Sequence, residues 1–420
     1  MNTEPKDTAS PVPSKGEGTI LPPSPLERVG ERLHILELPS FFPPHGGLFC
    51  LEQAKALKAY GHEVRIVSVV ELGVSIDKKF YFTAPRREER REIEGVEVFT
   101  YYMRAVPKAV RYNINQWVSL CQKAVHEYVR HFGKPDVLHA HCCKNAGLAA
   151  QEIAKSLGIP FFISEHISSG LFERDFGRGW QKHRWLKESM KQAYEAAACV
   201  IPVSRELVDD LAPYFGKEYH FRPISNIVDT NFFTYRERSG WSKVNDEWSV
   251  VGRPFCFCCL AIANIYGKGY DVLADALQYL PADIELHIAG QGTDSKPMQE
   301  LFAGKPNVHL HGHLDKAGVR DLLWKSDALV LPSRSESQSL VILEALATGI
   351  PAVSTECIPL SVRIPEACRF APIGDSQILA QKMKEAMHLI PSREYSDAVQ
   401  RLASPSVVAN QLSDLFSAAV

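Results

Sequence analysis

The sequence predicts an α/β protein of two domains, each built around a parallel β-sheet with helices on its faces. From about residue 33, short apolar runs rich in branched side chains alternate with longer segments of helical periodicity, as in consecutive strand-helix-strand units. The alternation stops over a polar segment, residues 232–253, and then resumes. The length of 420 residues exceeds one ordinary domain and suits two of about 150–200 residues each.

Six apolar runs define a predicted N-terminal domain over residues 31–231. They cover residues 33–38, 64–69, 96–101, 137–141, 161–164 and 200–203. Residues 1–30, which precede this domain, are rich in proline, serine, glycine and charge. This composition predicts a disordered tail.

Five further runs define a predicted C-terminal domain over residues 254–395. They cover residues 255–261, 285–289, 308–311, 328–332 and 352–355. Residues 232–253 are predicted to be the linker between the domains. Residues 396–420 are predicted to form a C-terminal helix that packs back on the N-terminal domain.

The composition excludes several classes of protein. A formal net charge of -2 gives no overall attraction to nucleic acid, so no nucleic-acid partner is expected. The ten cysteines, several of them in apolar runs, are typical of reduced core residues and predict a cytoplasmic protein. The N-terminus does not resemble a signal peptide, and no run of about 18 apolar residues occurs, so neither secretion nor a spanning helix is expected. A dehydrogenase is disfavoured because no Gly-x-Gly-x-x-Gly follows the first predicted strand.

The segment around residues 328–349 carries the strongest candidate site. An apolar strand enters a polar turn, and a helical pattern then runs until Gly349. The free backbone N-H groups of Ser339, Leu340 and Val341 at the start of that helix predict an anion site that suits a diphosphate. Glu336 can reach a sugar hydroxyl and Glu344 can accept from ribose hydroxyls. The alternative is that Glu336 only complements the helix dipole and Glu344 is a solvated residue.

Residues 332–351 read Pro-Ser-Arg-Ser-Glu-Ser-Gln-Ser-Leu-Val-Ile-Leu-Glu-Ala-Leu-Ala-Thr-Gly-Ile-Pro, which resembles the signature of the family-four glycosyltransferases, a large retaining group with the GT-B fold. The resemblance spans about residues 33–420 and implies an acceptor-binding N-terminal domain and a donor-binding C-terminal domain, with their sheets facing across a cleft. It is supported by further motifs in the family order: His45-Gly-Gly47, Asp136-Val-Leu-His-Ala-His141, Ser164-Glu-His166, Val203-Ser204, Ile224-Ser-Asn-Ile-Val-Asp229, Lys268-Gly269 and Gly290-Gln-Gly292.

Lys268 precedes a predicted helix in the C-terminal domain, where its ammonium would reinforce phosphate binding. A solvated lysine is the alternative. The resemblance adds Gly290 and Gly292 to the donor site. The family usually has an arginine about five positions before the lysine, but residues 260–264 read Leu-Ala-Ile-Ala-Asn. Either another basic residue replaces it, or diphosphate is bound more weakly.

Gly46 and Gly47 follow the first predicted strand and precede a helix expected over residues 49–60. Without side chains, they let the backbone approach a ligand closely, and the resemblance implies contact with the donor diphosphate from the opposite side of the cleft. The alternative is a simple turn. His45 is expected to line the same mouth on the acceptor side.

His166 follows a predicted strand and matches the cleft histidine of the family, where it would orient a hydroxyl near the reacting sugar. A structural histidine is the alternative. His139, His141, Cys142 and Cys143 suggest zinc, but the spacing lacks a second ligand pair and we reject a metal site. The resemblance instead implies that His141 lines the acceptor side of the cleft.

Two regions remain less defined. The family usually has two glycines and an acidic motif where residues 358–366 read Ile-Pro-Leu-Ser-Val-Arg-Ile-Pro-Glu, so donor-sugar contacts do not transfer to this segment. Basic residues cluster at 86–91 and, mixed with aromatics, at 172–191, which predicts peripheral contact with an anionic membrane carrying a lipid-linked acceptor. Interleaved glutamates favour the alternative of an ordinary mixed surface.

Together these features predict a retaining, metal-independent glycosyltransferase of the cytoplasm or the inner face of its membrane, with no cofactor. The donor is a nucleotide diphosphate sugar and the acceptor a carbohydrate or lipid-linked hydroxyl, in envelope polysaccharide or glycolipid assembly. His166, Glu336 and Lys268 are the predicted catalytic residues. Two alternatives stay open: a sugar-nucleotide epimerase of the same fold, and a degenerate GT-B protein that binds nucleotide sugar or a partner without turnover.

Overall fold

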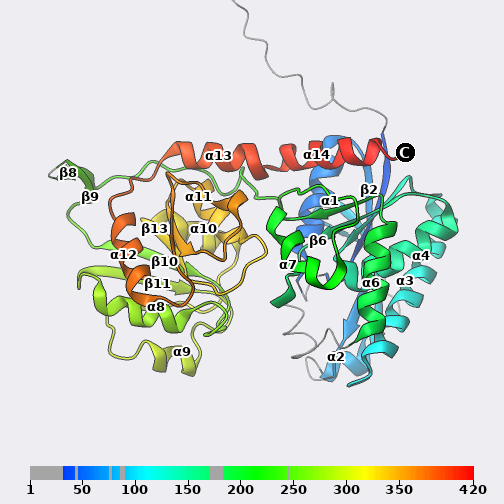
Figure 1. The fold of residues 1–420 in the computed structure, drawn as a ribbon, viewed down its shortest axis with the longest axis horizontal. Helices are drawn as coiled ribbons and strands as arrows, with labels where there is room; N and C mark the ends of the chain where they lie inside the picture. The colour runs from blue at the N-terminus through cyan, green and yellow to red at the C-terminus, as the bar shows by residue number, and fades with distance from the viewer. Residues whose placement is uncertain (1–31, 43–45, 75–77, 86–89, 171–182, 245) are drawn as a thin grey trace, which may run out of the picture.

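The computed structural model describes residues 32–42, 46–74, 78–85, 90–170, 183–244 and 246–420, which form two α/β domains (Figure 1). Each apolar run predicted as a strand forms one. Within these residues the N-terminal sheet has the order β3-β4-β2-β1-β5-β6-β7, and all its pairs are parallel except β3 with β4. Its strands are β1 (His34–Pro39), β2 (Glu63–Leu72), β3 (Arg91–Ile93), β4 (Val96–Arg104), β5 (Val137–His141), β6 (Phe161–Glu165) and β7 (Cys199–Pro202).

Helices cover both faces of this sheet. On one face α3, α4, α6 and α7 bury a core that includes Trp117 and Tyr194, and on the other face α1 packs around Ile35 and Ile66. The helices are α1 (Leu48–Tyr60), α2 (Lys78–Thr83), α3 (Val110–Phe132), α4 (Leu148–Leu157), α6 (Arg184–Ala196) and α7 (Arg205–Phe215).

The C-terminal sheet is parallel throughout its described strands, in the order β12-β11-β10-β13-β14-β15. Buried side chains on both of its faces form two separate cores. The strands are β10 (Phe255–Leu260), β11 (Ile284–Ala289), β12 (Val308–Leu310), β13 (Ala328–Leu331), β14 (Ala352–Thr355) and β15 (Cys368–Ala371), and the helices are α8 (Tyr270–Ala276), α9 (Lys296–Leu301), α10 (Lys316–Lys325), α11 (Leu340–Ala347) and α12 (Ser376–Ala386).

The segments that join the domains contain more structure than the polar sequence indicates. Residues 232–253 include an antiparallel hairpin, β8 (Trp241–Val244) and β9 (Glu247–Val250). The C-terminal region forms two helices, α13 (Arg393–Ala403) and α14 (Pro405–Ser417), because proline occupies the first position of α14 and lacks the N-H that would continue α13. These helices run from the C-terminal domain back over the N-terminal one (Figure 1), where Phe416 packs on Phe162.

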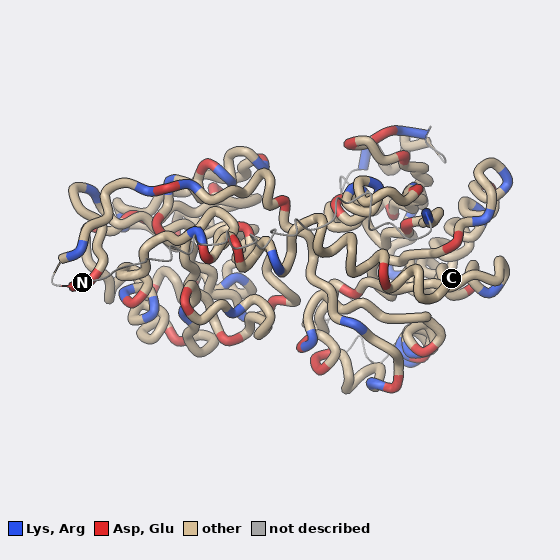
Figure 2. Tube along the Cα trace, turned by 90° about the horizontal axis from the view of Figure 1, so that it is seen from above, with Lys and Arg blue, Asp and Glu red and all other residues tan. Residues whose placement is uncertain are grey.

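Charges of both signs are scattered over both domains (Figure 2), in keeping with the near-neutral sequence. Within the described residues, no helix combines the length and apolarity that crossing a membrane requires. All ten cysteines are free thiols, and nine of them are buried.

Candidate functional site

The polar turn after β13 meets the loop after β10 at the carboxyl ends of these neighbouring strands. Gly269 has φ of 70°, and a Cβ at this position would lie 2.0 Å from the carbonyl oxygen of Pro332. Only glycine fits such a contact without a backbone shift. The backbone N-H of Arg334 donates to Gly267 O at 3.0 Å, so the two loops are held together.

Lys268 and Glu336 form an ion pair at this junction. Lys268 Nζ lies 2.7 Å from Glu336 Oε1, and Ser333 Oγ donates to the same oxygen at 2.7 Å. Both charged side chains are largely but not fully buried. The carboxylate is therefore held in place with its other oxygen available to a ligand.

Ser339 starts α11 in a left-handed conformation, with φ of 68° and ψ of 78°. Its hydroxyl is buried and has no hydrogen-bond partner within the described residues, so it does not cap the helix. The first backbone N-H groups of α11, those of Leu340 and Val341, have no acceptor within their own helix, whereas that of Ile342 donates to the carbonyl of Ser339 at 3.3 Å. Glycine would adopt this positive φ without strain.

Replacing Ser339 by glycine should stabilise the fold by about 1 kcal/mol, because it removes the cost of a left-handed non-glycine residue. Ser339→Ala is the matched control, since it removes the hydroxyl and keeps the strain. Urea unfolding of the three proteins measures the difference. A glycine variant less stable than wild type would show that the serine is not strained.

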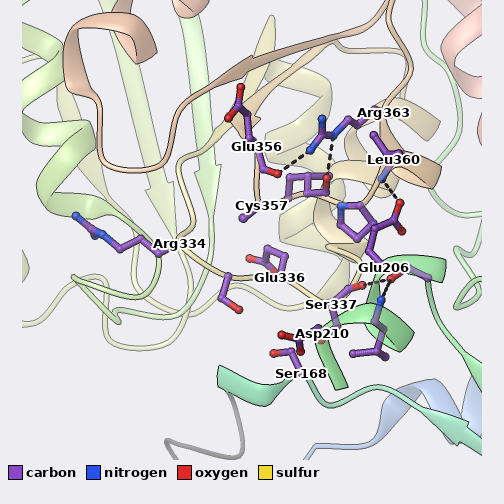
Figure 3. A pocket seen from close by; sticks show the side chains of 15 residues that line it. Ser168, Glu206, Asp210, Arg334, Glu336, Ser337, Glu356, Cys357, Leu360 and Arg363 are labelled. Carbon is purple, nitrogen blue, oxygen red and sulfur yellow. Dashed lines mark hydrogen bonds between the residues drawn. The ribbon is translucent and has the colours of Figure 1, made fainter. Parts of the chain in front are cut away.

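A cavity of about 270 Å³ lies beside Glu336, between the domains (Figure 3). The C-terminal domain contributes the turn after β13 and the loop after β14, and the N-terminal domain contributes residues after β6 and β7. Its polar lining includes carboxylates, hydroxyls and guanidinium groups. The lining includes Ser168, Glu206, Glu336, Ser337, Cys357 and Arg363.

Arg363 is the basic residue that the sequence did not identify. Its guanidinium donates to the carbonyls of Ile358 at 2.9 Å and Glu356 at 2.6 Å, and it has no carboxylate partner within the described residues. The charges of Glu336, Lys268 and Arg363 all act on the thiol of Cys357, whose pKa burial raises to about 11, so these groups surround one site. Arg363 occupies the segment whose family glycines are missing.

Arg334 cannot replace the arginine that is missing from residues 260–264. It makes a two-pronged pair with Asp271, at 2.8 and 2.7 Å, and lies over the ring of Tyr266. In Figure 3 its side chain points away from the other labelled residues. Arg334 therefore braces the loop before α8. Arg363, which also lies over the ring of Phe370, is the guanidinium that has no carboxylate partner among the described residues lining the cavity.

Glu344 does not line this cavity. It lies in the second turn of α11, half-buried, and burial raises the pKa of its carboxyl to about 7, with nearby Lys316 opposing the shift. Lys316 Nζ itself lies 2.8 Å from Asp229 Oδ2 and 3.9 Å from Glu52 Oε1. The folded protein therefore keeps a proton on Glu344 at pH values where the unfolded chain has lost it.

A buried histidine cluster lies in the N-terminal domain at the ends of β5 and β6. His141 Nε2 bonds to Glu37 Oε2 at 2.7 Å, and His139 Nδ1 lies 2.9 Å from the same oxygen. His166 Nε2 is 3.4 Å from His141 Nδ1. The ring of His166 stacks on Phe49, with centroids 3.8 Å apart. Glu37 and Phe49 were missed at the sequence level.

Gly47 brings α1 to this cluster. It has φ of 79°, and a Cβ would lie 2.0 Å from the carbonyl oxygen of Phe41. The tight turn places Phe49, in the first turn of α1, against His166 and His141. Gly46 precedes it with φ of 99°, whereas His45 lies outside the described residues.

The turn before α11 contacts the segment of Asn226, whose side chain lies beside His166. Gln338 Oε1 accepts from the backbone N-H of Asn226 at 3.0 Å, and Gln338 Nε2 donates to Ser225 Oγ at 2.7 Å. Ser204 Oγ donates to the carbonyl of Ser337 at 2.9 Å. His166, Glu336 and Ser339 therefore belong to one interdomain region.

The other predicted donor-site residues lie elsewhere. Gly290 and Gly292 follow β11 and pack against Ala261 and Ala263 after β10, outside the cavity beside Glu336. Of the basic clusters, residues 86–89 and 171–182 lie outside the described part of the chain. Arg90 pairs with Glu97 on the surface.

Two groups of side chains could bring metal ligands together. Donor atoms of Glu37, His139 and His141 lie within 4.8 Å of one another, but the 2.7 Å contact between carboxylate and imidazole is a direct hydrogen bond. Among the described residues, Cys142 and Cys143 belong to neither group. The second group, Cys256, Glu285 and His287, lies on the C-terminal sheet near the amino ends of β10 and β11.

Comparison with known proteins gives a family match for each of the two domains. Residues 46–232 match the family Glycosyltransferase Family 4, and residues 256–388 match Glycosyl transferases group 1. TuaC of Bacillus subtilis (strain 168), named as a teichuronic acid biosynthesis glycosyltransferase, is 24% identical over 333 residues, which cover 76% of this chain and 78% of TuaC.

Solved structures share the whole fold. Sucrose-phosphate synthase from Thermosynechococcus elongatus superposes with a TM-score of 0.70 at 17% identity, over 92% of this chain and 98% of that one. Anabaena Alr3699/HepE, solved in complex with UDP, gives a TM-score of 0.66 at 15% identity, over 92% of this chain and 100% of that one. The chain belongs to the family 4, group 1 glycosyltransferases and has their two-domain GT-B fold.

Proposed function

We propose that the chain transfers a sugar from a nucleotide diphosphate sugar to an acceptor hydroxyl, with retention at the anomeric carbon and without a metal ion. The observation that carries the proposal is the ion pair of Lys268 and Glu336, 2.7 Å apart, beside the start of α11. A fixed carboxylate suits a sugar hydroxyl, and an ammonium beside a helix N-terminus suits a diphosphate. A nucleotide diphosphate sugar carries both a sugar hydroxyl and a diphosphate.

In the proposed reaction, the bond between the anomeric carbon and the diphosphate oxygen breaks, and a bond to the acceptor oxygen forms on the same face. The acceptor proton passes to the departing diphosphate, so no protein nucleophile takes part. Lys268 and the free N-H groups of Leu340 and Val341 stabilise the charge that develops on the leaving group.

The remaining residues position the substrates. Glu336 holds a hydroxyl of the donor sugar, Glu344 accepts from the ribose hydroxyls, and His166 lies at the reacting centre with His141 behind it. Gly46 and Gly47 bring the backbone to the diphosphate from the opposite domain. Closure of the two domains excludes water that would otherwise hydrolyse the donor.

The names of the relatives support this assignment. HepE was solved with UDP, which is the leaving group of a UDP-sugar donor. TuaC is named for the synthesis of teichuronic acid, which favours an acceptor in cell-envelope polysaccharide assembly. We propose a cytoplasmic enzyme that meets this acceptor at the inner face of the membrane.

A panel of nucleotide sugars in a thermal-shift assay, followed by product analysis with a lipid extract as acceptor, tests the function. One nucleotide sugar should raise Tm and be consumed only when acceptor is present, and Glu336→Ala should weaken both effects. If no nucleotide sugar shifts Tm and Glu336→Ala changes nothing, the proposal fails. Conversion of the donor alone to another nucleotide sugar would indicate an epimerase, and binding without turnover a degenerate scaffold.

Replacing Arg363 by glutamine should weaken UDP binding about 10–100-fold, because a charge-assisted contact to phosphate contributes roughly 1.5–3 kcal/mol. Arg369→Gln is the matched control. Arg369 also donates to backbone carbonyls, those of Pro365 and Cys368, but does not line the cavity. Isothermal titration measures both affinities. Equal affinities would mean that Arg363 does not replace the missing arginine.

A surface near α2 suits contact with a membrane that carries the acceptor. Phe82 and Tyr112 are 66% and 53% exposed, and Lys78 and Lys79 lie in the first turn of α2. Tyr81 ties α2 to Ala105 by a bond of 3.2 Å. Exposed aromatic groups beside lysines are typical of interfacial binding to anionic lipid.

The double variant Phe82→Ser, Tyr112→Ser should reduce binding to phosphatidylglycerol vesicles about tenfold, because it removes the apolar area available for insertion. Co-sedimentation with the vesicles measures the binding. Ile373→Ser, at an apolar position on the C-terminal domain that is 50% exposed, should leave binding unchanged. Loss of binding in the control, or none in the double variant, would exclude this surface.

A further inference from the structure

The histidine cluster starts from a buried carboxylate. Glu37 lies within the apolar strand β1 and is fully buried. Burial alone raises the pKa of a carboxyl, but His139 and His141 beside it lower the pKa of Glu37 to about 2. Glu37 is therefore ionised, and its oxygens can only accept hydrogen bonds.

Because Glu37 only accepts, His141 must donate from Nε2 across the 2.7 Å contact. Burial, assisted by His139, lowers the pKa of His141 to about 4, against the opposing effect of Glu37. The ring is neutral at physiological pH and carries a single proton, on Nε2. Its Nδ1 is left as an acceptor.

The same reasoning applies to His166. Its Nε2 lies 3.4 Å from His141 Nδ1, and since that atom accepts, His166 Nε2 must donate. Burial lowers the pKa of His166 well below its ordinary value, with His141 and His139 adding to the shift, so this ring is neutral too. Its Nδ1 therefore carries a free lone pair, and stacking on Phe49 fixes the direction of that lone pair.

The acceptor at His166 Nδ1 is not used within the described residues. The atom is buried and has no hydrogen-bond partner there, and the same holds for Oδ1 of Asn226. The side chain of Asn226 lies beside His166 and raises the pKa of its ring, against the larger effect of burial. Within the described residues neither buried acceptor meets a donor in hydrogen-bond geometry, so a bound group that donates would satisfy them. A hydroxyl supplies one.

We propose that Glu37 is a positioning residue which, through His141, holds His166 in the tautomer that presents Nδ1 as an acceptor to a hydroxyl of the bound carbohydrate. This inference rests on the proposed function and adds a residue and a proton arrangement to it. Glu37 does not touch substrate. It determines which ring nitrogen of His166 contacts the substrate.

The tautomer can be observed directly in the full chain labelled with [15N]histidine. Long-range 1H-15N correlation spectra distinguish protonated from unprotonated ring nitrogens, and comparison with His166→Gln assigns the signals. We expect a protonated Nε2 and an unprotonated Nδ1 in His166 at neutral pH. A proton on Nδ1, or on both nitrogens, would overturn the inference whether or not the chain is active.

Variants of Glu37 test its effect on turnover. Glu37→Gln keeps an oxygen that can accept from His141, so it should retain the tautomer and most of the activity. Glu37→Leu removes the acceptor and should lower kcat about 10–100-fold, as loss of an outer-shell partner typically does. The Kd for UDP should not change, because Glu37 contacts neither Gly46 and Gly47 nor the groups of the C-terminal domain that are proposed to bind the diphosphate. His141→Gln is a second variant, since it can still donate to Glu37 but has no acceptor at the Nδ1 position.

His62→Leu provides the matched control for stability. His62 is a buried histidine of the same domain, bonded to Ser413 Oγ at 2.8 Å, and lies outside the cluster. It should lower Tm without lowering kcat. If wild type transfers sugar and Glu37→Leu behaves like His62→Leu, the positioning role is wrong. If wild type neither binds nor transfers any sugar from UDP-glucose or GDP-mannose, the proposed function fails, and the spectra still decide the tautomer.

Discussion

Lys268→Ala should lower kcat by about 10²–10³-fold, the usual effect of removing one group that stabilises charge in the transition state. The loss has two causes. The ammonium no longer balances the charge on the departing diphosphate, and Glu336 is left as an unpaired carboxylate beside that charge, since its partner at 2.7 Å is gone. Steady-state kinetics with saturating donor and acceptor measure the change.

Lys296→Ala is the control for this variant. Lys296 is an exposed lysine paired with Glu300 on α9, so it shares the charge of Lys268 but not its position. Its kcat should equal that of wild type. A Lys268→Ala enzyme with the same kcat as this control would show that the ion pair is structural, and the proposed donor site would have to move.

Glu344→Gln should remove a pH dependence of stability that wild type possesses. The carboxyl ionises near pH 4.5 in the unfolded chain and near pH 7 in the folded one. Between these values the folded state holds the extra proton, so wild-type stability falls as pH rises through the window. The total loss is up to about 3 kcal/mol above pH 7, and the glutamine variant should not show it.

Urea unfolding at several pH values measures this effect, with Glu300→Gln as the control because Glu300 lies on the surface. The control should follow wild type at each pH. A Glu344→Gln variant with the same pH profile as wild type would show that the carboxyl is not perturbed.

The affinity for the donor should also depend on the ionisation of the Glu344 carboxyl. Ribose hydroxyls donate to the ionised form, so binding of UDP near pH 6.5 should release a proton and become tighter as pH rises. Titration calorimetry in two buffers of different ionisation enthalpy counts the released protons. Glu344→Gln should release none. Equal proton release in both proteins would remove Glu344 from the ribose site.

Much of the fold could be predicted because its signals are local. The buried strands of a parallel sheet are short apolar runs, and the helices between them start and end at recognisable residues, such as α1 between Gly47 and Gly61. The hairpin β8-β9 could not be predicted, since each strand has only four residues, half of them polar, and none of its side chains is buried. Its pairing depends on a turn rather than on a hydrophobic pattern.

The residues of the candidate site also separate into those that the sequence could predict and those that it could not. Lys268, Glu336 and Ser339 lie in motifs that are contiguous in sequence, so they could be identified there. Glu37 could not, because a glutamate within an apolar run gives no sign that its partners lie 102 and 104 residues away on β5. Arg363 could not be identified from the sequence for another reason. Its segment departs from the family pattern, and only the folded loop brings its charge to Cys357 and Glu336.

The central claim is that a nucleotide diphosphate sugar bound at Lys268 and Glu336 gives up its sugar with retention. The most direct measurement is the anomeric configuration of the first-formed product, read from the one-bond 1H-13C coupling of its anomeric centre by NMR. An α-linked nucleotide donor should give an α-linked glycoside in wild type and far less product in Lys268→Ala. A β-linked product would contradict the account, and so would an unchanged yield from the variant.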